Sequence, residues 1–163
     1  MANTIMTRGG MDDTTLSPGW AVKNGAVAGV IAGVVFAIGE VLGATMMMGQ
    51  PLMPFHMFAS VPLQREPTAI DQGTALLVGT ISHMAYSVVF GVIVALIVAS
   101  VRALRASRTA TLVFSIVVGL VSWPLNFFVI APLIGAPWFA QQTEPMQLIA
   151  QALFHVIFGG IIG

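Results

Sequence analysis

The chain has 163 residues, of which 57% are hydrophobic and 7% are charged, and its formal net charge is zero. Soluble domains carry about 25% charged residues, so this chain has too few charges to solvate a globular surface. A neutral chain lacks the basic face that nucleic acid binding requires, and the absence of cysteine excludes disulfides, thiolate metal sites and cysteine nucleophiles. The composition therefore predicts an all-α integral membrane protein with one domain, residues 1–163, and the lipid bilayer as its main partner.

Four apolar stretches follow a polar tail at residues 1–20. They cover residues 21–48, 73–101, 109–130 and 146–163. A helix needs about 20 apolar residues to cross a bilayer, a length that the last stretch barely reaches, so a continuation of the natural chain beyond Gly163 is left open. The first stretch is too long, and its polar tail too extended, for a cleaved signal peptide. We expect four transmembrane helices.

The basic residues predict how these helices are oriented. Five of the six lie before or at the start of the first stretch or between the second and the third: Arg8, Lys23, Arg102, Arg105 and Arg108. Arg65 alone lies in the loop between the first and second stretches. Cytoplasmic loops of membrane proteins are enriched in lysine and arginine. The pattern therefore predicts a multi-pass protein of the bacterial inner membrane with both termini in the cytoplasm.

Two proline-containing segments indicate an internal duplication. PLMPFHMFA occupies residues 51–59 and PLIGAPWFA occupies residues 132–140, and both fall on the predicted outer side. The identical positions are Pro51 and Pro132, Leu52 and Leu133, Phe58 and Phe139, and Ala59 and Ala140. The apolar stretches that follow the two segments also align with each other, and His83 and His155 occupy equivalent positions in this alignment. We therefore expect two hairpins of the same orientation, residues 21–101 and 109–163, each with a proline-containing interfacial segment on the outer face.

Small residues recur every four positions in the apolar stretches. Gly25, Gly29 and Gly33 form a row in the first stretch, a pattern that permits close contact between membrane helices. Comparable rows pass through Ser87 in the second stretch, Asn126 in the third and Gln151 in the fourth. We expect these rows to face the interior of a four-helix bundle.

Three ionisable residues lie at membrane depth: Glu40, His83 and His155. Each lies eight to ten residues from an outer helix end, about 12–15 Å at 1.5 Å per residue. Ionisable groups are costly there and suggest a function. With Ser87, Asn126 and Gln151 they form the predicted buried polar cluster. Three interpretations remain open: structural hydrogen bonding, a haem b whose iron is held by His83 and His155, and a proton or cation path around Glu40.

A copper site is a further, weaker alternative near the outer face. Met53, His56 and Met57 offer thioether and imidazole ligands, and thioethers select Cu(I). The second segment lacks the equivalent histidine, so such a site would belong to one repeat.

No phosphate-binding loop and no catalytic triad is present in the sequence. The leading functional expectation is a small non-catalytic membrane protein that acts through helix association, as a homo-oligomer or as an accessory subunit of a membrane complex. The haem-binding electron carrier and the small transporter or proton-conducting unit are the alternatives.

Overall fold

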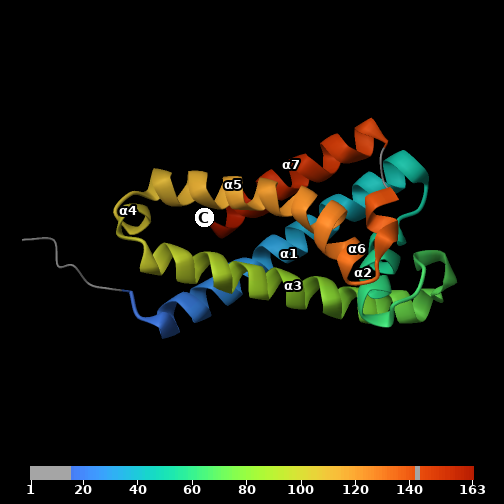
Figure 1. Ribbon diagram of the computed structural model, residues 1–163, viewed down its shortest axis with the longest axis horizontal. Coiled ribbons are helices and arrows are strands. Elements are labelled where there is room, and N and C mark those ends of the chain that lie inside the picture. The colour runs from blue at the N-terminus through green and yellow to red at the C-terminus, as the bar shows by residue number, and fades with distance from the viewer. Residues whose placement is uncertain (1–15, 142–143) are drawn as a thin grey trace, which may run out of the picture.

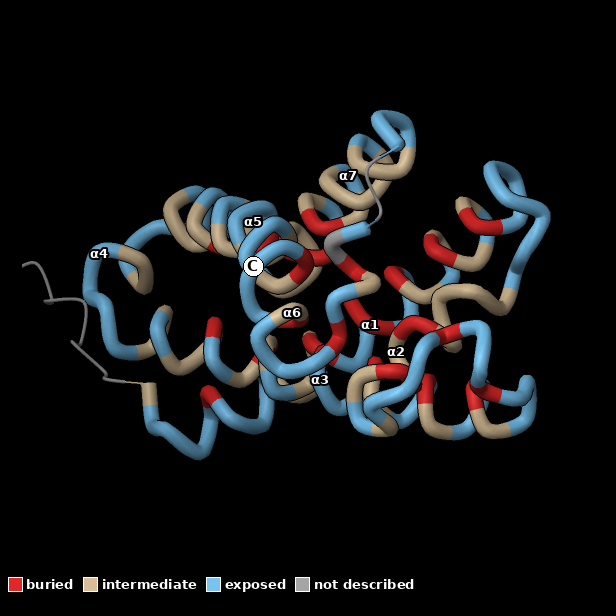
Figure 2. The backbone as a smooth tube through the Cα atoms, turned by 45° about the vertical axis from the view of Figure 1, so that its right-hand side comes forward, coloured by how far each residue is buried: buried red, intermediate tan, exposed pale blue. Residues whose placement is uncertain are grey.

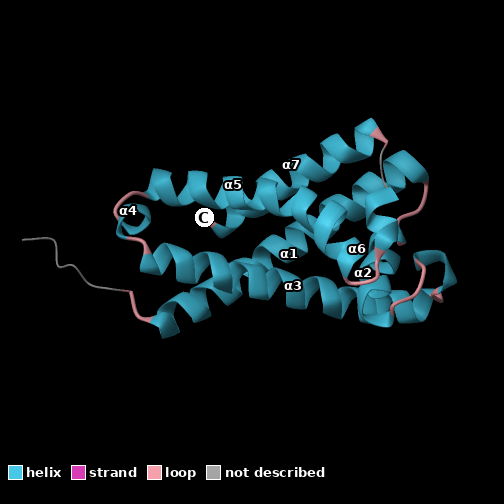
Figure 3. Ribbon diagram, in the orientation of Figure 1, coloured by secondary structure: helices cyan, strands magenta, loops and turns pink. Residues whose placement is uncertain are grey.

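The computed structural model describes residues 16–141 and 144–163, and every regular element in that part of the chain is helical (Figure 3). Four helices are long and apolar enough to cross a membrane. They are α1 (Pro18–Met48), α3 (Gln72–Ser100), the continuous helix Arg108–Leu133, and α7 (Pro145–Ile162). The helix Arg108–Leu133 consists of α5 (Arg108–Leu125), a π-helical turn η2 (Asn126–Ile130) and a last turn α6 (Ala131–Leu133). The structure therefore confirms four long apolar helices where hydropathy predicts them.

Polar side chains just outside the apolar stretches start three of these helices. Ser17 accepts a hydrogen bond from the Trp20 backbone N–H at 3.1 Å, and Asp71 accepts one from Thr74 at 2.9 Å. Ser107 accepts one from Ala110 at 3.2 Å. Such caps satisfy backbone donors that have no partner within the helix. The bond from the Thr74 backbone also lowers the pKa of Asp71, because it stabilises the ionised carboxylate.

α3 packs against α1, α1 against α7 and α7 against α5, whereas α3 and α5, which are separated in Figure 1, do not pack closely on each other. Small residues allow the close pairs. A Cβ atom built on Gly25 would lie 2.6 Å from the carbonyl oxygen of Gly91, and one on Gly119 would lie 2.5 Å from that of His155. Both distances are far below van der Waals contact. Gly25, Gly29 and Gly33, the predicted contact row, lie against α3 in the structure.

Exposed positions follow the outward faces of the four long helices and buried positions follow the inner faces (Figure 2). Many of the exposed positions hold large apolar residues. Val27, Ile38, Val89 and Val121 are among the exposed ones. An outer surface of this kind suits contact with lipid chains rather than with water.

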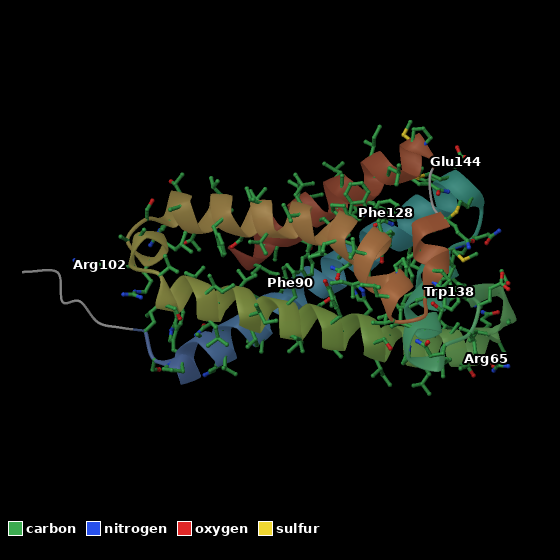
Figure 4. The ribbon with its side chains drawn as sticks, viewed as in Figure 1. Arg65, Phe90, Arg102, Phe128, Trp138 and Glu144 are labelled. Atoms are coloured by element: carbon green, nitrogen blue, oxygen red, sulfur yellow. The ribbon has the colours of Figure 1, made fainter. Side chains whose placement is uncertain are left out.

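The two ends of the bundle carry different connections. The short helix α4 (Arg102–Arg105) lies at one end with the start of α1, and α2 (Met53–Leu63) and α6 lie at the other (Figure 1). Arg65 and Glu144 lie at the α2 end, opposite Arg102 (Figure 4). The basic loop and the two proline-containing segments are therefore at opposite ends of the molecule.

The two proline-containing segments share that end but differ in form. The first builds an 11-residue helix, α2. The second ends α6 and continues as the 3₁₀ helix η3 (Pro137–Gln141). They pack on each other through an apolar cluster: Met57, Phe127, Ala131, Ala136 and Phe139, flanked by Met53, Val61, Trp123 and Trp138. We call this layer the roof, because it covers one end of the bundle interior.

Candidate functional site

A cavity of about 410 Å³ lies beneath the roof, between α3 on one side and α5 with η2 on the other. Its wall is mostly aromatic and aliphatic, with contributions from all four membrane-spanning helices and from α2. The polar residues on it are Glu40, Ser82, His83, Tyr86, Ser87, Ser122, Asn126 and His155. α3 and α5 do not pack against each other along their lengths, so no helix contact closes the cavity between these two helices. We call this the open side of the cavity.

His83 lies on α3 and is 4% exposed. Its Nε2–H donates to the backbone carbonyl of Gly33 on α1 at 2.8 Å, which the absence of a side chain at Gly33 makes reachable. The carbonyl only accepts, so the proton is on Nε2 and Nδ1 carries a lone pair. That Nδ1 is covered by neighbouring atoms and has no partner among the described residues.

His155 lies on α7 and is 8% exposed. Its Nδ1–H donates to the carbonyl of Gln151, one turn earlier in the same helix, at 2.8 Å. This bond leaves Nε2 as the lone-pair nitrogen. Nε2 has no hydrogen-bond partner within residues 16–141 and 144–163, and the residue lines the cavity.

Glu40 lies on α1 and is 7% exposed. The side chain of Gln151 is its polar neighbour, while one carboxyl oxygen, Oε2, and the Gln151 side-chain oxygen are buried without partners among the described residues. Glu40 also borders a second cavity of about 60 Å³, which extends toward Met47 and Gln147 at the roof end. The carboxyl group therefore stands where the two cavities meet.

Phe36 brings the two histidines into one aromatic cluster. Its ring centroid lies 5.8 Å from that of His83 and 4.9 Å from that of His155. Phe58 lies 4.5 Å from His83, and Phe127 lies 6.3 Å from His155. Phe90 and Phe158, 5.5 Å apart, close the interior toward the α4 end; Phe90 is labelled between the helices in Figure 4.

One side-chain hydrogen bond spans the open side of the cavity. The Asn126 amide on η2 donates to the Tyr86 hydroxyl on α3 at 2.5 Å. A π-helical turn inserts an extra residue into the helix and is often found at functional sites, and here it begins at the residue that makes this bond.

The structure brings together most of the predicted polar cluster. Glu40, His83, Ser87, Asn126 and His155 all line the large cavity, and Gln151 lies beside Glu40 in the smaller one. Sequence reasoning missed Phe36 and Tyr86. Tyr86 lies three residues after His83, on the same helix face, and this spacing was an available signal.

The copper candidates lie in and beside the roof. Met57 is buried in the roof cluster with Met53 against it, and His56 Nδ1 donates to the carbonyl of Pro67 at 3.0 Å. Within the described ranges no three His, Asp or Glu side chains gather closely enough to hold a metal ion. A thioether site at the roof stays a prediction.

These features fit a membrane protein: the described residues are helical, four helices are long and apolar enough to cross a bilayer, and a partly polar cavity lies between them. No known protein family, curated protein or solved structure matches the chain.

Proposed function

We propose that this chain is a non-catalytic multi-pass membrane protein that binds a lipophilic small molecule inside the bilayer. The observation that supports this best is the cavity between α3 and α5, about 410 Å³, within the 300–1,000 Å³ common for ligand sites. Its lining is mainly apolar with a few convergent polar groups, which is typical of such sites.

One of those polar residues argues for an occupant. His155 is 8% exposed and lines the cavity, and its Nε2 has no hydrogen-bond partner among the described residues. Buried polar groups are nearly always hydrogen-bonded, because leaving one unpaired costs about 1–3 kcal/mol. A bound molecule with polar atoms of its own would relieve part of that cost.

The open side supplies a route of access. A ligand dissolved in lipid would reach the cavity between α3 and α5 without crossing water, and an alkyl tail would remain among the lipid chains. The Tyr86–Asn126 hydrogen bond lies on this route.

We propose that the α4 end faces the cytoplasm of a bacterial cell and that the roof lies at the outer face of the inner membrane. The clustering of Arg102, Arg105 and Arg108 at the α4 end supports this orientation. We also retain the duplication as a proposal. In its support, Gly29 is closely apposed to the Ser87 carbonyl in the first hairpin, as Gly159 is to the Ser115 carbonyl in the second.

Association with a second copy or with a larger membrane complex is the second candidate. The glycine row of α1 packs against α3 and so is not free for a partner. The observation that favours association is the unpacked side between α3 and α5, into which a helix of a partner could fit.

The haem and proton-path alternatives rest on the same residues. Axial ligation would need His83 Nδ1 and His155 Nε2, and a porphyrin between them would have to displace Phe36, which contacts both rings. A proton path would use Glu40, which borders both cavities. A proton path does not account for the large apolar volume, and haem would require the displacement of Phe36, so we prefer another lipophilic ligand.

The test is a variant that fills the cavity. Ser122 lines it, and its neighbour Val121 is 56% exposed on the lipid side of the same helix. Native mass spectrometry of protein purified in mild detergent should detect a retained small molecule. Ser122→Phe should lose it and Val121→Phe should keep it. Equal retention by both variants would contradict a ligand in this cavity.

A further inference from the structure

The lone pair on His155 Nε2 is the polar feature of the cavity best placed to select a ligand. Nδ1 of His83 and Oε2 of Glu40 are covered by neighbouring atoms, so a molecule in the cavity cannot reach them directly. Nε2 of His155 is not covered in this way and has no partner within the described ranges. A ligand that pairs with it must donate a hydrogen bond, because the other ring nitrogen holds the proton.

The surroundings of His155 favour a flat ring. Phe36 meets the imidazole edge-on with centroids 4.9 Å apart, and Phe127 does so at 6.3 Å. Trp123 lies 6.5 Å away at an interplanar angle of 42°. Aromatic rings prefer edge-to-face or offset contact with other rings. A planar head group is therefore better accommodated here than a branched aliphatic one.

The open side adds a second polar contact. Tyr86 accepts from Asn126, so its own hydroxyl proton remains available to a ligand oxygen. The cavity thus offers an acceptor at His155 and a donor at Tyr86. A hydroxyl group on a ring has both roles, whereas a carbonyl can only accept.

We propose that the occupant is a lipophile with a phenolic head, a phenol or a hydroquinone, whose hydroxyl donates to Nε2 of His155. This inference rests on the proposed function, since it names the head group of the same ligand. A phenolic O–H donates more strongly than an aliphatic one, and its ring matches the aromatic wall. A quinone would place a carbonyl oxygen against the imidazole lone pair, and the two acceptors would repel. A lipophilic amine would lack an exposed carboxylate partner, because the unpaired oxygen of Glu40 is covered.

The experiment compares four probes that share one decyl chain: a decyl hydroquinone kept reduced under anaerobic conditions, its dimethyl ether, the corresponding benzoquinone, and decylamine. Affinity is measured on the purified protein in nanodiscs by displacement of a lipophilic fluorophore. We expect the hydroquinone to bind about tenfold more tightly than the other three, the size of effect that one hydrogen bond to a buried acceptor supports. Preference for the benzoquinone or the amine would overturn the inference.

Variants then assign the preference to one residue. His155→Phe keeps an aromatic ring and removes the acceptor, so it should bind hydroquinone and ether equally, with ether affinity unchanged. His56→Phe is the matched control, because His56 lies on α2 and does not line the cavity. If His155→Phe does not fold, the comparison of the hydroquinone with its ether on the unaltered protein decides alone. Equal binding of all four probes would contradict the phenolic head and leave the proposed function standing. Binding of none would contradict the proposed function itself.

Discussion

Trp138 Nε1 donates a hydrogen bond to the hydroxyl oxygen of Ser60 at 2.6 Å, although 78 positions separate the two residues. Ser60 is fully buried in α2, and its own hydroxyl donates to the Met57 carbonyl. The bond joins η3 to α2, and thus the second proline-containing segment to the first. It holds the roof together at the end of the cavity.

Removing this bond should loosen the roof without unfolding the bundle. Trp138→Phe keeps an apolar ring but leaves the buried Ser60 oxygen without its donor. We expect a loss of about 1 kcal/mol in unfolding free energy, with a lower Tm in detergent. Trp20→Phe is the control, since Trp20 is 47% exposed at the start of α1 and should leave Tm unchanged. Equal effects from the two variants would argue against a specific role for the bond.

A side chain at Gly29 should force α1 and α3 apart. A Cβ atom there would overlap the Ser87 carbonyl, and the α-carbon of Val88 would lie 2.9 Å away. Gly29→Ile should therefore cost about 1–3 kcal/mol or more, the usual penalty of overpacking, seen as a lower Tm. At Gly19 an added Cβ meets nothing within 4 Å, so Gly19→Ile controls for the loss of glycine. Because the contact is internal, the size on gel filtration should stay the same; a change in oligomeric state would indicate a contact between protomers.

We expect His83 to contribute to the stability of the protein and not to haem binding. Its Nε2–H ties α3 to α1 at Gly33, and interhelical hydrogen bonds in membranes average about 0.6 kcal/mol with a maximum near 1.7. His83→Phe should therefore lower the unfolding free energy by that modest amount, which would be measured as a lower Tm. The absorption spectrum of the unaltered protein should show no Soret band. A sharp Soret band that His83→Ala and His155→Ala each abolish would restore the haem interpretation.

The orientation can be tested with single cysteines, because the chain contains none of its own. A cysteine introduced at Arg65 should react with a membrane-impermeant maleimide added to intact spheroplasts. A cysteine at Ser107, beside α4, should react only after the membrane is opened. The reverse pattern would invert the proposed topology.

The sequence by itself determined the class of the protein and the positions of its membrane-spanning helices. Composition and hydropathy suffice for this, because a bilayer demands long apolar helices with internal hydrogen bonds whatever their neighbours are. Local chemistry also placed the helix starts, since Ser17, Asp71 and Ser107 cap the backbone only a few residues away. The four-residue rows of small and polar side chains contain residues that the structure buries, among them His83 and His155.

Only the tertiary structure decided which helix faces pack against each other and which helices remain unpacked. Periodicity shows that Gly25 and Gly29 belong to a contact face, but only the packed helices show that α3 occupies it and that α3 and α5 remain unpacked. The pairings of Asn126 with Tyr86 and of Phe36 with both histidines join residues far apart in the chain. Such contacts depend on crossing angles and side-chain shapes summed over the whole bundle. The cavity is the space that this packing leaves unfilled, and no local pattern in the sequence encodes it.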